Sequence, residues 1–166
     1  MEHRLEERPA LRLLGHALDT ALADGRNQRE IPAFWAAHAR GPRQAMLAAL
    51  GRRDAPEYGA VARFDAHSGA MRYFIGMEAG PDLGAAPPGL TWLVVPAGRY
   101  AVLRSRPAAS EAEFLAAIPA LWGEAMAWLP GSGLQPREAP SFEYYDGHAR
   151  PDAAPRRFME LWLPVA

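Results

Sequence analysis

The stretch IPAFW at residues 31–35 returns as IPALW at residues 118–122, a shift of 118 − 31 = 87 positions. The same shift carries Tyr58 onto Tyr145 and Tyr73 onto Glu160. Several elements that recur in one order at one offset indicate that a single structural unit is used twice. Because such a unit cannot close its own core, we expect the two copies to pair, with a ligand pocket at their junction.

The composition narrows the class of protein. A chain of 166 residues with 49% hydrophobic residues suits one folded domain. The absence of cysteine excludes disulfides and thiolate chemistry, and the absence of lysine excludes Schiff-base and phosphate-loop lysine chemistry. A net charge of −1 argues against direct nucleic-acid binding. The N-terminus lacks a signal peptide and no apolar run has membrane-spanning length, so we expect a soluble, cytoplasmic protein.

The order of elements follows from apolar periodicity and turn residues. Pro32 suits the first turn of a helix, and Ser110 with Glu113 has the form of a capping box. Pro119 should kink the second helix or split it in two. The expected elements are a strand within 11–20, a helix from about 32 to 50 interrupted at 41–42, strands 58–64 and 71–78, a strand 91–104 bent at 96–98, a helix from 110 to about 130, and strands 140–146 and 157–165.

The predicted fold is therefore α+β, a tandem repeat of strand-helix-strand-strand. The two halves should give an antiparallel sheet with two helices on one face. We expect a single domain over residues 1–166, with repeat one at about 10–78, a linker at 79–90 and repeat two at 91–165.

Two glutamates fall in strands that also carry aromatic residues. Strand alternation places Glu160 on one face with Phe158 and Trp162, and it places Glu143 on one face with Tyr145. We expect both carboxylates on the face away from the helices, in an aromatic box that suits a lipophilic cation. The alternative is that each glutamate is solvated or paired with a neighbouring arginine, for which Arg99, Arg156 and Arg157 are available, and the pattern alone leaves this open.

Other residues that carry chemistry give weaker signals. The five histidines show no metal-ligand spacing, and no serine or threonine stands in a recognisable triad. Trp35 and Trp122 lie in helical segments, where a core role is more common than a pocket wall. We expect no metal and no cofactor.

At this point the chain resembles a known family, the gyrase-inhibitor-like small-molecule-binding domain, which also serves as the effector-binding domain of AraC-type and MerR-type multidrug regulators. The set of motifs runs in family order from about residue 10 to the C-terminus, and the closest type is the stand-alone, integron-cassette protein. The motifs are IPAFW (31–35), RYFIGME (72–78), VPAGRYAV (95–102), WLPGSG (128–133), FEYY (142–145) and ELWLPV (160–165).

The resemblance implies pseudo-twofold symmetry, a cleft at the junction of the repeats, and binding of hydrophobic, often cationic, small molecules. The acidic role then falls on Glu143 and Glu160, and the site also includes aromatic residues, namely Tyr145, Trp162, Phe158, Tyr100, Tyr73 and Trp35. No helix-turn-helix segment precedes residue 10, so no direct contact with DNA is expected, and a separate regulator protein as partner is left open. A haem-binding family shares the fold, but the scattered histidines do not support haem.

Two functions remain in competition. The first is binding of a lipophilic, cationic, drug-like molecule, for transcription regulation or for sequestration. The alternative is hydrolysis of strained, electrophilic small molecules in the same cleft, where a glutamate beside a tyrosine would supply general base and acid, and the candidate glutamates are Glu143 and Glu160. We rank binding above catalysis, because the sequence offers no covalent nucleophile and water would have to attack.

Overall fold

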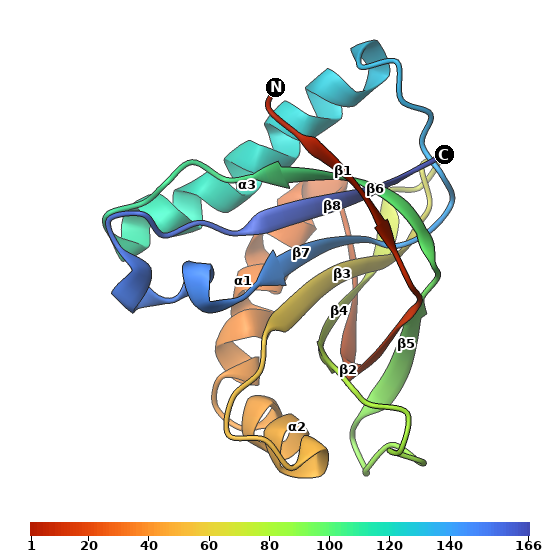
Figure 1. The fold of residues 1–166 in the computed structure, drawn as a ribbon, viewed down its shortest axis with the longest axis vertical. Helices are drawn as coiled ribbons and strands as arrows, with labels where there is room; N and C mark the ends of the chain where they lie inside the picture. The colour runs from red at the N-terminus through yellow and green to blue at the C-terminus, as the bar shows by residue number, and fades with distance from the viewer. The chain divides into compact units, whose positions relative to one another are not determined.

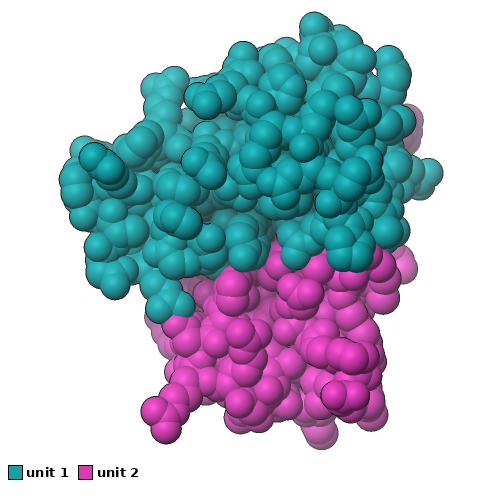
Figure 2. Space-filling view, in the orientation of Figure 1, with its two compact units in different colours: residues 1–9, 96–166 teal, residues 10–95 magenta.

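The computed structural model describes all 166 residues, and the chain divides into two compact units (Figure 2). Unit 1 comprises residues 1–9 and 96–166, and unit 2 comprises residues 10–95. The chain therefore passes between the units twice, at Pro9–Ala10 and at Val95–Pro96. None of the helices is long and apolar enough to cross a membrane.

Unit 2 is a four-stranded antiparallel sheet in the order β3-β4-β2-β5, with two helices (Figure 1). The helices pack against β2 and β4, and Met46 and Leu47 of the second helix bury themselves beside Met77. The elements are β2 (Leu11–Ala21), a 3-10 turn (Ala23–Gly25), α1 (Arg26–His38), α2 (Pro42–Leu50), β3 (Glu57–Phe64), β4 (Ala70–Glu78) and β5 (Thr91–Val95).

Unit 1 repeats this plan as a four-stranded antiparallel sheet in the order β7-β8-β6-β1, with one long helix. Its elements are β1 (Arg4–Arg8), β6 (Gly98–Arg104), α3 (Glu111–Trp128), β7 (Ser141–Tyr145) and β8 (Glu160–Val165), with 3-10 turns at Leu129–Gly131, Gly147–Ala149 and Pro151–Ala153. The predicted α+β class and the strand-helix-strand-strand repeat are confirmed. The expected interruption at 41–42 divides the first helical region into α1 and α2, and α2 ends at Leu50 with Gly51 as its cap.

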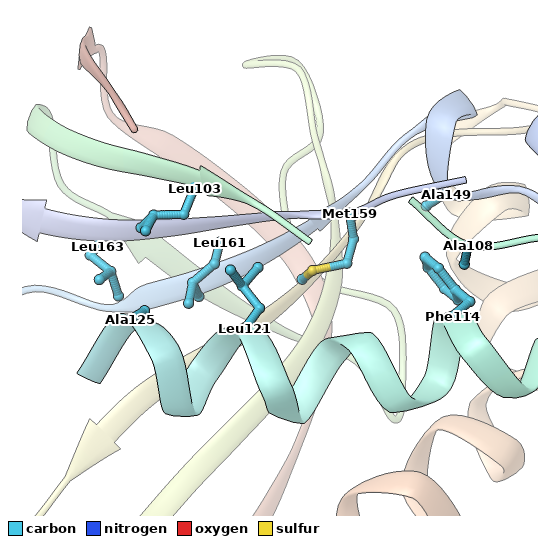
Figure 3. Close-up of a cluster of buried hydrophobic side chains, with 9 residues drawn as sticks. All are labelled: Leu103, Ala108, Phe114, Leu121, Ala125, Ala149, Met159, Leu161 and Leu163. Carbon is cyan, nitrogen blue, oxygen red and sulfur yellow. The ribbon is translucent and has the colours of Figure 1, made fainter. Parts of the chain in front are cut away.

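The core of unit 1 lies between α3 and the strands (Figure 3). Leu121 and Ala125 on α3 face Leu161 and Leu163 on β8, and all four side chains are buried. The sequence predicted this face, because Met159, Leu161 and Leu163 alternate with the polar and aromatic residues of the last strand. Phe114 and Met159 extend the same cluster.

Both helices run through their prolines. The helix α1 begins at Arg26, where an ion pair from Arg26 Nε to Glu30 Oε1 (2.6 Å) supports the first turns, so Pro32 lies inside it. The expected start at Pro32 is therefore wrong. The helix α3 begins at Glu111 and is capped by Ser110, whose hydroxyl accepts a bond from the Glu113 amide at 3.2 Å as the capping box predicts. It continues through Pro119 to Trp128 without the expected split.

Two edge strands differ from the elements predicted from the sequence. Residues 91–104 form two strands, because Thr91–Val95 pairs with β2 in unit 2 while Gly98–Arg104 belongs to unit 1. The first strand was expected within 11–20, but the charged N-terminus already forms the strand β1, which pairs with β6. Each unit thereby gains an edge strand, and the two occupy matching places. Arg4 pairs with Val102 and Thr91 pairs with Gly15, and the shift of 87 carries Gly15 onto Val102 and Arg4 onto Thr91.

The offset between the copies is not constant. Leu14 pairs with Met77 in unit 2, and Ala101 pairs with Leu163 in unit 1, so the shift is 101 − 14 = 87 in the first strand and 163 − 77 = 86 in the last. Tyr73 therefore corresponds to Met159 and not to Glu160. In the third strand Tyr58 pairs with Gly76 and Phe142 pairs with Trp162, which gives a shift of 142 − 58 = 84.

Replacing Leu161 by Ala tests the core of unit 1. The side chain is fully buried against α3, so we expect a loss of about 3 kcal/mol in the free energy of unfolding. The matched control is Leu115→Ala on the outer side of α3, where the side chain is 57% exposed and the change should stay within about 0.5 kcal/mol. Equal effects of the two substitutions in urea denaturation would contradict the assigned packing.

Candidate functional site

Glu143 lies in β7 with its carboxylate held by two aromatic side chains. The residue is only 5% exposed. The indole Nε1 of Trp122, on α3, donates to Oε1 at 2.7 Å, and the hydroxyl of Tyr145 donates to Oε2 at 2.7 Å. Each carboxylate oxygen therefore accepts a bond from an aromatic residue, which fixes the orientation of the carboxylate.

The two aromatic partners of this carboxylate pack against the apolar core. Trp122 and Tyr145 are partly buried and pack against the core cluster of unit 1. The ring of Phe114 meets that of Tyr145 edge-on, with 6.5 Å between centroids. In such surroundings a carboxylate interacts more strongly with a neighbouring charge than it would in water. The cluster of Glu143, Trp122, Tyr145 and Phe114 is called the Glu143 cluster below.

The strand register separates the two glutamates. Glu143 pairs with Leu161, whose side chain faces α3, whereas Glu160 pairs with Tyr144. Directly paired residues in an antiparallel sheet point to the same face, and neighbours along a strand point to opposite faces. The expectation that both carboxylates share the face away from the helix is therefore wrong, because Glu143 lies on the helix face.

Glu160 is bound by two arginines. Arg4 on β1 donates to it in a bidentate arrangement, with Nη1 to Oε1 at 2.8 Å and Nη2 to Oε2 at 2.9 Å. Arg104 Nε and Trp162 Nε1 add bonds at 3.2 Å each. Burial is the largest single influence and raises the pKa of Glu160, but the bonds and charge of Arg4, together with the bonds from Arg104 and Trp162, outweigh it and the pKa is lowered overall. The arginine-paired alternative thus describes Glu160, although its partners are Arg4 and Arg104.

The aromatic residues near Glu160 form a packed layer on the other face of the sheet. The ring of Trp162 stacks on that of Phe142 at 5.4 Å, and Tyr100 lies 6.0 Å from Trp162 and is fully buried. The guanidinium of Arg8 lies 5.1 Å from the Trp162 ring centroid. Phe158 precedes β8 and stacks on His148 at 4.7 Å.

Unit 2 carries a related aromatic pair on the helix face of its sheet. The indole Nε1 of Trp35, on α1, donates to the hydroxyl of Tyr73, on β4, at 2.9 Å. Tyr73 is 1% exposed and Trp35 is partly buried. Trp35 and Trp122 stand at the shift of 87, so both copies use a helix tryptophan as a hydrogen-bond donor to the strands beneath it.

The structure also reveals a histidine pair that sequence reasoning missed. His38 is 1% exposed, and its Nε2 lies 2.7 Å from Glu57 Oε1 while its Nδ1 lies 3.0 Å from His16 Nε2. A carboxylate accepts only, so Nε2 of His38 carries a proton and, in the neutral ring, Nδ1 accepts from His16. The spacing of 22 residues between His16 and His38 gave no signal, because the pair forms across a strand and a helix.

Comparison with known proteins identifies the family. The sequence matches the family model of the GyrI-like small molecule binding domain over residues 1–166. The chain belongs to this family. No curated protein sequence matches the chain. The family assignment confirms the resemblance drawn from the sequence motifs.

Three solved structures illustrate the similarity of this GyrI-like domain to known folds. SAV2435 bound to tetraphenylphosphonium matches with a TM-score of 0.74 and 20% identity, over 100% of this chain and 94% of that chain. The integron cassette protein VCH_CASS2 from Vibrio cholerae matches at 0.69 and 15%, over 99% and 95%. The C-terminal domain of EcmrR matches at 0.61 and 15%, over 99% and 97%. At these identities the matches establish the fold.

The pair of His16 and His38 in unit 2 can be tested by the pH dependence of stability. Burial, and secondarily the charge of His38, lowers the pKa of His16 to about 4, below the ordinary value of 6.5. A histidine whose pKa is lower in the folded state favours the neutral form there, so stability is full above pH 6.5 and falls as the pH drops towards 4.

Between pH 7 and pH 5, urea denaturation should show the parent losing about 1 kcal/mol more stability than His16→Gln, since partial exposure reduces the effect of the shift. The exposed His67→Gln serves as the matched control and should follow the parent. A parallel pH dependence of His16→Gln and the parent would contradict the assignment.

Proposed function

We propose that this GyrI-like domain binds a lipophilic organic cation at the Glu143 cluster of unit 1. The observation that carries the proposal is a buried carboxylate whose two oxygens are oriented by the indole of Trp122 and the hydroxyl of Tyr145. A carboxylate set among ring faces attracts a desolvated cation both by charge and by the ring quadrupoles. SAV2435, which shares the fold, was solved with tetraphenylphosphonium, a ligand of this class.

Glu143 suits the role of charge partner better than Glu160 does. A cation at Glu160 would compete with the bidentate guanidinium of Arg4 and with Arg104. Loss of that ion pair would leave two arginines without their carboxylate, which costs more than the new contact returns. Glu160, Trp162, Tyr100 and Phe158 are therefore interpreted as residues that hold β1 and the sheet together, and the helix-face residues are interpreted as the ligand contacts.

The charge of Glu143 can be tested by Glu143→Gln with tetraphenylphosphonium as the probe. The amide keeps the shape but loses the negative charge, so the dissociation constant should rise about ten- to a hundredfold. Neutral triphenylphosphine oxide should lose little affinity. The exposed Glu138→Gln is the matched control for net charge and should bind as the parent does.

Isothermal titration measures the affinities. An equal melting temperature of both variants shows that each is folded. Unchanged affinity of Glu143→Gln for the cation would refute the proposal. The same samples, incubated with excess electrophilic ligand, separate binding from the alternative hydrolase function, because a binding protein returns the ligand intact.

Another prediction concerns the aromatic pair of unit 2, Trp35 and Tyr73. If the aromatic pair of unit 2 also contacts a cation, Trp35→Ala should weaken tetraphenylphosphonium binding about fivefold or more, through loss of a ring face and of the donor to Tyr73. Trp92→Ala is the matched control, because Trp92 lies in β5 of the same unit with its ring under Arg12 at 3.7 Å. Equal affinities of Trp35→Ala and the parent would confine the ligand contacts to the Glu143 cluster.

A further inference from the structure

A β-bulge in unit 2 brings two arginines opposite each other. Along β3 and β4, Val61 pairs with Tyr73, and the next pair is Arg63 with Arg72, so Ala62 is the extra residue. Without it, Ala62 would stand opposite Arg72. Bulges of this type often re-aim a side chain at a functional position. Here the bulge turns both Ala62 and Arg63 towards the face that carries Arg72.

The row of charges across these strands is unbalanced. Asp19 on β2 pairs with Arg72 on β4 and accepts two bonds from it, at 2.8 and 3.2 Å. Arg63 stands on the other side of Arg72, is exposed and makes no ion pair. Like charges directly opposite each other in a sheet are destabilising. The row of Asp19, Arg72 and Arg63 therefore has a net charge of +1 and favours an added anion.

The same face is hollowed beside these arginines. A shallow groove of about 170 Å³ lies between them and β5, and its lining includes small and apolar side chains, namely Ala17, Ala62, Phe74, Thr91 and Leu93. Thr91 and Leu93 point into this face by strand alternation, since they pair with Gly15 and Leu13. A space of this size is close to what one benzene ring requires.

We infer that this groove is a second ligand site, which takes a small monocarboxylate with an apolar body of about one ring. The carboxylate would lie at Arg63, completing the charge row, and the apolar body would lie against Ala17, Ala62 and Leu93. Phe74, only 2% exposed, forms a firm floor. The site is independent of the proposed cation site, because its residues all belong to unit 2 and its charge preference is opposite.

The probe for this site is benzoate, followed by methyl NMR of Ala17, Ala62 and Leu93. We expect saturable shifts confined to these methyl groups, with a dissociation constant on the order of 1 mM. Arg63→Gln should weaken benzoate about three- to tenfold, and Asp19→Asn should strengthen it, because Arg72 then also becomes available. Ala17→Leu, at an exposed position, should fill the groove and abolish binding.

The matched controls are Arg53→Gln, an exposed arginine of the same unit, and benzamide as the uncharged analogue of the probe. Benzoate binding that persists in Arg53→Gln and exceeds that of benzamide supports the site. Three outcomes would each overturn the inference. They are methyl shifts that rise linearly with benzoate concentration without saturating, equal losses of benzoate affinity in Arg63→Gln and Arg53→Gln, and benzoate binding that survives Ala17→Leu. Tetraphenylphosphonium affinity should be the same in all of these variants.

Discussion

Burying a carboxylate costs several kcal/mol unless the protein compensates the charge, and unit 1 buries two of them in adjacent strands. For Glu160 the compensation is ionic, and it has a structural consequence. The bidentate bond from Arg4 ties the N-terminal strand β1 to the middle of the sheet, although 156 positions separate the two residues. For Glu143 an indole and a phenol each donate a hydrogen bond to one carboxylate oxygen, and these bonds fix how the carboxylate is oriented.

The sequence predicted the architecture well because the relevant signals are local. Apolar alternation located the strands, the capping box located the start of α3, and the echo of residues 31–35 at 118–122 identified two helices with equivalent roles. The echo was informative because Trp35 and Trp122 both donate their indole N–H to the strands below. The edge strand β1 was not predicted, because Arg4–Arg8 has no apolar alternation and is held by an ion pair between Arg4 and Glu160, which is distant in sequence.

The residues of the candidate site were predicted less well than the fold, because the face on which a side chain lies depends on the exact register of its strand. A slip of one residue in a strand moves every side chain to the other face. The shift between copies falls from 87 in the first strand to 86 in the last, so Tyr73 corresponds to Met159, and Glu160 falls on the face away from α3. The sequence suggested Glu143, Tyr145, Tyr73 and Trp35 as ligand-binding residues, which stays a prediction, and the face on which Glu143 lies could be assigned only from the strand register. The His16–His38 pair could not be read at all, because it depends on a helix packing over a strand.

Comparing the copies strand by strand shows where the duplication has diverged. The shift of 84 in the third strand places Gly59 of unit 2 at the position of Glu143, so the carboxylate of the candidate site occurs in one copy only. Unit 2 keeps the helix tryptophan but supplies a phenol, that of Tyr73, from a different strand as its partner. A single carboxylate oriented by aromatic donors suits a monovalent, bulky and apolar cation, which is why we assign charge recognition to Glu143.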